Sequence, residues 1–125
     1  MSKEYKVFVY GTLRKGDVRF GVLEDLEEMG QAKFIREAKT KPLYKLLDLG
    51  AFPGLKNGGY TEVVGEMWEI DKYTKQLLDN IEGVPILYQD EPVEIEGEKD
   101  VFAYFYQRED RGYKEIKSGD WFKKD

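Results

Sequence analysis

The segment 6–11, KVFVYG, constrains the fold more than any other part of the chain. Alternate side chains of an extended strand point to opposite faces, so Val7 and Val9 would share one face. Phe8 and Tyr10 would share the other. Because both faces are then apolar, other parts of the chain must cover the strand on both sides. We therefore expect a central strand of a sheet.

The rest of the chain shows more strand patterns than helix patterns. The segment 51–59, AFPGLKNGG, is expected to be a turn, and the tail 114–125 to be irregular and anchored by Trp121. Strands and helices do not alternate regularly, which favours an α+β domain with a curved or closed sheet over a doubly wound one. Strands are expected at 32–40, 43–50, 63–70, 86–97 and 100–109, with a turn around Gly97, and helices at 19–30 and 71–83.

The second of these helices has signals at both ends. Asp71 is a good N-cap, and Gly83 is a typical helix stop. Its predicted buried face is formed by residues that recur every four positions, Tyr73, Leu77 and Ile81. The first helix would bury Phe20, Leu23 and Leu26. Four acidic residues of this helix are expected to face solvent, Glu24, Asp25, Glu27 and Glu28. A metal site formed by them is disfavoured, because no loop would fold their oxygens around an ion.

Length and composition indicate one globular domain spanning residues 1–125, since 125 residues is a common domain size and 41% of them are hydrophobic. No segment resembles a secretory signal or a membrane helix, so we expect a soluble, cytoplasmic protein. The net charge of −5 disfavours contact with nucleic acid or an acidic membrane surface. The charged fraction of 36% is typical of thermophile proteins, a hypothesis that a melting curve tests.

The missing residue types exclude several kinds of chemistry. The chain has no cysteine and no histidine, and its only serines are Ser2 and Ser118. Disulfides, thiol nucleophiles, Cys/His zinc sites and a Ser-His-Asp triad are therefore impossible. Any proton transfer must use a carboxylate, a lysine, a tyrosine or water.

The segment 10–16, YGTLRKG, follows the central strand and contains two glycines. A phosphate-binding P-loop needs Gly-Lys followed by serine or threonine, and this pattern is absent here. The segment could still direct its backbone amides at an anion, with Arg14 and Lys15 nearby. On the pattern alone, an ordinary strand-to-helix corner is the more frequent structure.

Glu82 stands at the predicted carboxyl end of the second helix, where the helix dipole disfavours a negative charge. Partial burial there would raise its pKa toward a value that is useful for proton transfer. A solvated surface glutamate is the commoner alternative. A tyrosine of the strand 100–109, Tyr104 or Tyr106, could also reach a pocket.

Five motifs follow one another along the chain: VFVYGTLRKG, PLYKLLDLGAFPGL, VVGEMWEI, LLDNIEGVPILY and GDW. In this order they resemble the gamma-glutamylcyclotransferase-like family, and the pair YGTLR and LDNIEG is the most specific. The resemblance implies a compact mixed β-barrel with a pocket at one end and a few flanking helices, without a cofactor or metal. It implies Glu82 as the acid/base. It also implies a substrate-binding set: Tyr10, Gly11, Thr12, Leu13 and Tyr88.

This chain differs from many relatives at two places. They have asparagine or histidine where this chain has Arg19-Phe20, and an aromatic residue where it has Val84. Both differences bear on which substrate fits.

The activity that the resemblance implies is cyclisation of a gamma-glutamyl amine or dipeptide to 5-oxoproline with release of an amine or amino acid. This reaction needs no enzyme nucleophile and no metal, so it suits a chain without cysteine and histidine. Two other readings remain open. The pocket could bind a small anionic amino-acid-like ligand without turnover, or the aromatic surface could serve a structural partner.

Overall fold

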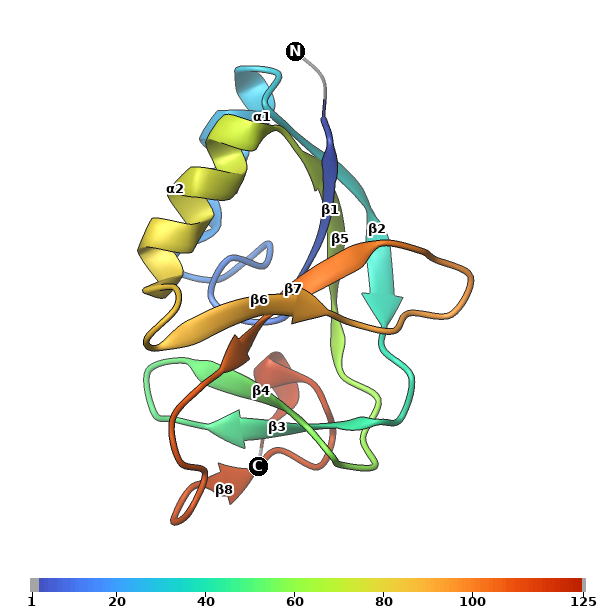
Figure 1. Cartoon of the computed structure of the whole chain (residues 1–125), viewed down its shortest axis with the longest axis vertical. Helices are drawn as coiled ribbons and strands as arrows, with labels where there is room; N and C mark the ends of the chain where they lie inside the picture. Colours follow the sequence, from blue (N-terminus) through green and yellow to red (C-terminus); the bar gives the residue numbers. More distant parts are fainter. Residues whose placement is uncertain (1–2, 125) are drawn as a thin grey trace.

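The computed structural model describes residues 3–124, which form eight strands, two α-helices and one short 3-10 helix. Figure 1 shows their arrangement. In chain order the elements are β1 (Tyr5–Val9), α1 (Phe20–Glu28), β2 (Ala32–Lys39), β3 (Tyr44–Asp48), β4 (Pro53–Asn57), β5 (Val64–Ile70), α2 (Lys72–Glu82), β6 (Tyr88–Pro92), β7 (Val101–Tyr106), β8 (Lys114–Glu115) and the 3-10 helix η1 (Trp121–Lys123).

All eight strands belong to one mixed sheet with β1 and β7 at its centre. The order is β2-β5-β1-β7-β4-β3-β8, and β6 pairs with β7 as well. β1 runs antiparallel to β5 and parallel to β7. The predicted hairpin is present, because β6 and β7 pair antiparallel and Gly97 lies in their connection with a positive φ of 80°. One mixed sheet with two helices confirms the predicted α+β class.

The sheet is not closed into a barrel, which differs from the mixed β-barrel that the family resemblance implied. Within residues 3–124, the terminal strands of the order, β2 and β8, do not pair with each other. The chain after β2 meets the chain after β6 at an isolated bridge between Thr40 and Ile95. A hydrogen bond of 2.9 Å from the Lys41 N–H to the Glu94 carbonyl oxygen adjoins it. A barrel requires a continuous ladder between its first and last strands, and one bridge does not supply it.

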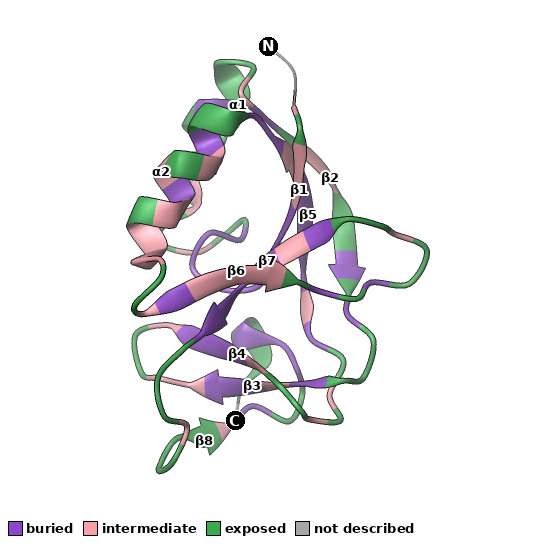
Figure 2. Ribbon diagram, viewed as in Figure 1, coloured by how far each residue is buried: buried purple, intermediate pink, exposed green. Residues whose placement is uncertain are grey.

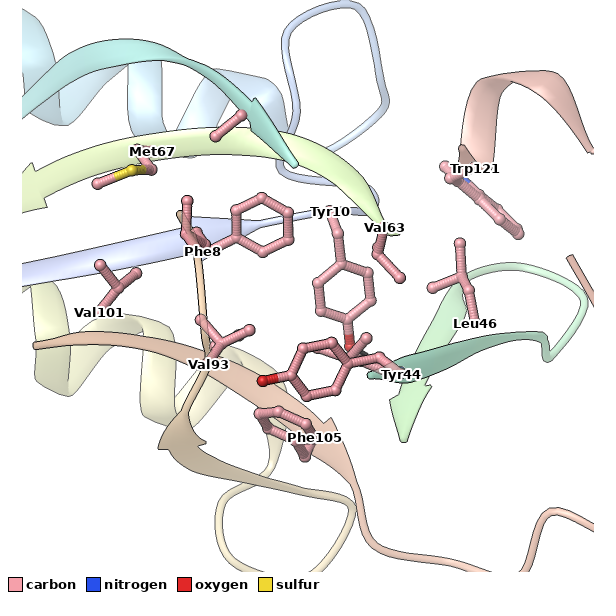
Figure 3. Close-up of a cluster of buried hydrophobic side chains, with 14 of the residues drawn as sticks. Phe8, Tyr10, Tyr44, Leu46, Val63, Met67, Val93, Val101, Phe105 and Trp121 are labelled. Atoms are coloured by element: carbon pink, nitrogen blue, oxygen red, sulfur yellow. Dashed lines mark hydrogen bonds between the residues drawn. The ribbon is translucent and has the colours of Figure 1, made fainter. Parts of the chain in front are cut away.

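The two faces of β1 are covered as the alternation predicted. Val7 and Val9 belong to a buried cluster that includes residues of both helices, and Figure 1 shows α1 and α2 on the same side of the strand. Phe8 and Tyr10 belong to a second cluster on the other face, which Figure 3 shows together with residues of β3 and β7. Both clusters appear in Figure 2 as buried stretches along β1, β5 and β7. The prediction of a central strand is therefore confirmed.

Both predicted helices form, and the end signals of α2 are confirmed. The Asp71 carboxylate accepts a hydrogen bond of 2.8 Å from the Thr74 N–H, and Gly83 ends the helix in the left-handed conformation. The predicted buried face was partly wrong, because Leu78 is fully buried whereas the Tyr73 side chain is 53% exposed. Among residues 3–124, no helix is long and apolar enough to cross a membrane.

The segment 51–59 is not only a turn. Its middle, residues 53–57, is the strand β4, which pairs with β3 and, at Leu55, with β7. Leu55 is fully buried, so this strand is stabilised by its partners although it contains Pro53 and Gly54. Gly54 lies so close to Tyr106 that an added Cβ would stand 3.0 Å from the tyrosine Cβ.

The tail is more ordered than expected. It contains β8, which pairs with β3, and η1. Trp121 is buried with 9% of its surface exposed, so the predicted anchor is confirmed.

Candidate functional site

A pocket lies where the residues after β1, the last turn of α2 and the start of β6 meet. It holds about 540 Å³ of empty space, including the part open to solvent. Among the described residues 3–124, the charged side chains that line it are those of Arg19 and Glu82. The wall contains all six residues that the sequence singled out, Tyr10, Gly11, Thr12, Leu13, Glu82 and Tyr88.

The turn after β1 is shaped by its own backbone. The Arg14 N–H donates to the Gly11 carbonyl oxygen at 3.0 Å, and the Arg19 N–H donates to the Thr12 carbonyl oxygen at 2.9 Å. The N–H groups of Gly11, Thr12 and Leu13 donate to no other group within residues 3–124. Successive backbone amides in a turn are a common anion-binding arrangement in proteins.

The tail residues Asp120 and Trp121 hold this turn from outside, and we call them the C-terminal clamp. The Arg14 guanidinium donates from Nη1 to Asp120 Oδ1 at 2.8 Å in a buried ion pair. The Trp121 Nε1–H donates to Asp17 Oδ2 at 2.8 Å. The Arg14 guanidinium also lies 4.1 Å from the centre of the Phe122 ring. The turn is thus fixed by residues more than 100 positions away in the chain.

The cations expected beside the turn do not face the pocket. Arg14 is 5% exposed and bound to Asp120, and it is not part of the pocket wall. The Lys15 ammonium lies 3.7 Å from the centre of the Phe34 ring, also outside the wall. The cation that lines the pocket is Arg19.

The hydroxyls of two tyrosines of the wall, Tyr10 and Tyr88, are fixed by hydrogen bonds to the backbone. The Tyr10 hydroxyl donates to the Tyr104 carbonyl oxygen and accepts from the Leu55 N–H at 3.1 Å. The Tyr88 hydroxyl donates to the Pro53 carbonyl oxygen at 2.6 Å. These contacts tie β1, β4, β6 and β7 together around the pocket, so its aromatic side is rigid.

Tyr104, and not Tyr106, is the residue of β7 that lines the pocket. Its hydroxyl donates to Asp79 Oδ1 at 2.7 Å. Burial raises the pKa of the hydroxyls of Tyr10, Tyr88 and Tyr104, and the negative charge of Glu82 contributes in each case. All three therefore stay protonated at neutral pH.

Glu82 is the last residue of α2 and is half-buried in the pocket wall. Within residues 3–124 its carboxylate forms no hydrogen bond or ion pair with another side chain or backbone group. Burial raises its pKa from 4.5 to about 7, and the positive charge of Arg19 acts in the opposite direction. The predicted rise is confirmed. A carboxyl group with this pKa can both accept and donate a proton near neutral pH.

The sequence reasoning left several wall residues unassigned. Tyr104 was one of two candidates, and Arg19 was noted only as a departure from the family pattern. Phe52 and Pro53 fall in the segment that was expected to be a turn. The sequence around Gly83 did not indicate that Ile81 and Leu87 line a pocket. The wall residues that the sequence did not assign to the pocket are Phe8, Val9, Arg19, Phe52, Pro53, Ile81, Leu87 and Tyr104. In the described part of the chain, no group of three or more acidic residues is arranged to hold a metal ion.

Comparison with known proteins identifies the family. The model of the family "Gamma-glutamyl cyclotransferase, AIG2-like" matches residues 7–123. This chain belongs to that family. A Vibrio cholerae protein, provisionally named a gamma-glutamylcyclotransferase, is 39% identical over 118 residues, which cover 94% of this chain and 96% of that protein. The zebrafish gamma-glutamylaminecyclotransferase A is 40% identical over 87 residues, which cover 66% of this chain and 53% of its own length.

Two solved structures share the fold of this chain. An AIG2-like protein from mouse superposes with a TM-score of 0.73 at 27% identity, covering 88% of this chain and 84% of the mouse chain. An uncharacterised protein from Pyrococcus horikoshii superposes with a TM-score of 0.75 at 30% identity, covering 94% and 90%. The predicted family is therefore confirmed.

Proposed function

We propose that this protein cyclises a gamma-glutamyl compound to 5-oxoproline and releases the attached amine or amino acid, with Glu82 as the general acid/base. The observation that carries the proposal is the unpaired Glu82 carboxylate, with its pKa of about 7, in the same pocket as the turn 10–13. Family membership supports the reaction class, because relatives carry the names gamma-glutamylcyclotransferase and gamma-glutamylaminecyclotransferase.

The reaction is an exchange of one C–N bond for another within the substrate. The α-amine attacks the gamma-amide carbonyl carbon, the five-membered lactam closes, and the bond to the leaving nitrogen breaks. Two protons leave the attacking nitrogen, which changes from an ammonium to a lactam N–H. The departing amine gains both protons as it changes from an amide N–H to an ammonium.

Glu82 can carry these protons one at a time. Its carboxylate first removes a proton from the ammonium and so exposes the lone pair that attacks. The resulting carboxylic acid then protonates the leaving nitrogen. The regenerated carboxylate takes the second proton from the new ring nitrogen and passes it to the departing amine, which leaves as an ammonium and returns Glu82 to its ionised form. Acid/base assistance of this kind contributes about 10²–10⁴ in rate, and it works best when the pKa lies near the working pH.

The amides of Gly11, Thr12 and Leu13 would bind the substrate α-carboxylate or the oxyanion that develops on the carbonyl. Backbone donors of this kind are already fixed before the reaction, so they stabilise charge without reorganisation. Tyr88 would form the pocket wall against which the glutamyl chain bends, and Tyr10 would hold the turn in register with β7 through its hydrogen bond. Holding the amine against the carbonyl would lower the barrier by several kcal/mol more.

The test compares wild type with Glu82→Gln on a panel of gamma-glutamyl amines and dipeptides, with 5-oxoproline measured by mass spectrometry. We expect the variant to fold normally and to lose turnover by at least about 10²-fold, because glutamine keeps the shape but cannot exchange protons. Glu28→Gln is the matched control, since Glu28 is exposed on α1 far from the pocket wall. Lactam formation by Glu82→Gln at the wild-type rate would remove Glu82 from this role.

A pocket that binds these compounds without forming 5-oxoproline would instead support a binding module. Calorimetric titration of wild type with the same panel separates the two readings. Binding without turnover contradicts the enzyme proposal, and binding with turnover supports it.

A further inference from the structure

Arg19 is the second charged residue of the pocket, and the reaction described above gives it no task. It precedes α1 directly, and the hydrogen bond from its N–H to the Thr12 carbonyl oxygen fixes its backbone to the turn. Its side chain is exposed although it lines the pocket, so it lies at the solvent-facing rim. Unlike Arg14, which Asp120 neutralises, the Arg19 guanidinium forms no hydrogen bond or ion pair within residues 3–124.

The charges of a gamma-glutamyl substrate can be matched to the pocket one by one. The glutamyl group always carries an α-ammonium and an α-carboxylate. In the proposed function, which this inference rests on, Glu82 faces the ammonium and the amides of residues 11–13 face an anionic oxygen. An additional anion on the substrate would then have one cationic partner in the pocket wall, Arg19.

The leaving group is the part of the substrate that extends toward the rim, because the glutamyl end must reach Glu82 and the turn. We propose that Arg19 binds a carboxylate on the leaving group, so that the preferred substrates are gamma-glutamyl amino acids rather than gamma-glutamyl amines that lack a carboxylate. A planar guanidinium can hold a carboxylate through two parallel hydrogen bonds, which gives selectivity for that group. The released product is then an amino acid.

The charge of Arg19 also acts inside the pocket, because it opposes the rise of the Glu82 pKa. A bound carboxylate would neutralise this charge. The pKa of Glu82 should therefore be slightly higher when the dipeptide is bound than when a neutral amide is bound. The pH-rate profile of the dipeptide should shift to higher pH.

The experiment uses two substrates that differ only in charge, gamma-glutamyl-alanine and gamma-glutamyl-alaninamide. The readout is the ratio of their kcat/KM values in wild type, Arg19→Met and Arg19→Lys. Because the rim is exposed to solvent, we expect wild type to prefer the dipeptide by about three- to tenfold. Arg19→Met should bring the ratio close to one, and Arg19→Lys should retain part of the preference.

Lys15→Met is the matched control, since it removes a cation from the same turn but outside the pocket wall. It should keep the wild-type ratio. A ratio that Arg19→Met leaves unchanged would overturn the inference. An equal loss on both substrates would also overturn it, because Arg19 would then act on the shared glutamyl group.

The same preference can be measured without turnover. In a Glu82→Gln background, calorimetric dissociation constants of the two compounds should differ by a similar factor, and Arg19→Met should abolish the difference. Absence of 5-oxoproline from every substrate would contradict the proposed function, whereas equal dissociation constants would contradict the role of Arg19. The two failures are therefore distinguishable.

Discussion

Removing the Asp120 carboxylate should strongly destabilise the protein, because Asp120 is the ion-pair partner of the buried Arg14. Asp120 and Arg14 form an ion pair at 2.8 Å in which the side chains are only 12% and 5% exposed. Asp120 Oδ1 also accepts the Phe122 N–H at 2.9 Å and so caps η1. Truncation to alanine would leave the buried Arg14 charge without its partner.

The expected loss follows from this geometry. Breaking a buried pair by removing one partner typically costs about 3–5 kcal/mol of unfolding free energy. For a domain of this size, that loss lowers the melting midpoint by roughly 10–20 °C. Asp120→Asn keeps an oxygen that can accept both hydrogen bonds and loses only the charge, so it should cost about 1–2 kcal/mol.

The effect should depend on pH in a definite direction. Burial of Asp120 alone would raise its pKa, but the hydrogen bonds from Arg14 and the Phe122 N–H outweigh burial and lower it. The pair therefore stabilises the fold above the unfolded aspartate pKa of about 3.9, and this stabilisation is lost as the pH falls through the lower folded value. The difference between wild type and Asp120→Asn should narrow below about pH 4.

Urea unfolding at pH 7 followed by circular dichroism measures the loss, and Asp25→Ala on the exposed face of α1 is the control, expected within about 0.5 kcal/mol of wild type. A double-mutant cycle with Arg14→Met isolates the pair. If Asp120→Ala lowers the unfolding free energy by less than about 1 kcal/mol, or if the two changes are additive, the tail does not clamp the turn.

Three further predictions follow from the buried residues of α2. First, kcat/KM should fall about tenfold per pH unit below the Glu82 pKa of about 7, because the reaction needs the carboxylate, and a pH-rate profile measures this. Second, Glu82→Gln should raise the unfolding free energy at pH 8 by about 1–3 kcal/mol and much less at pH 4. The reason is that the raised pKa of Glu82 in the folded protein contributes stability below the unfolded pKa, and this stability is lost as the pH rises through about 7. Urea unfolding at both pH values measures the gain in unfolding free energy, and equal gains at pH 4 and pH 8 would refute the reasoning. Third, Leu78→Ala should cost about 2–5 kcal/mol by leaving a cavity under the helix, since Leu78 is fully buried, whereas the exposed Tyr73→Ala should cost far less in the same assay.

The sequence predicted those features that depend on local signals. The apolar side chains of Val7 and Phe8 predicted that both faces of β1 are buried, because the pleat places neighbouring side chains on opposite sides. Asp71 and Gly83 marked the ends of α2 because capping depends only on the nearest backbone groups. The six predicted pocket residues lie in short motifs, and the fold brings all of them to one cavity.

Features that depend on distant partners were not predictable. β4 forms around Leu55 because β3 and β7 bury it, although its own sequence favours a turn. Arg14 was expected near an anion bound at the turn, but it is buried and paired within the protein instead. Its partner, Asp120, lies 106 positions away, and no local pattern connects the two.

The pocket joins both kinds of feature in one residue. Local helix signals decide that Glu82 ends α2, but its proton affinity comes from burial among aromatic residues of other strands, including Tyr10, Tyr88 and Tyr104. An ionised carboxylate at that position costs stability above pH 7, and the hydrogen bonds of these tyrosines hold the wall in place against that cost. The C-terminal clamp holds the turn after β1 in place through its ion pair and hydrogen bond. A substrate ammonium bound beside Glu82 would compensate its unfavourable negative charge. The same half-buried carboxylate would therefore serve both substrate binding and proton transfer.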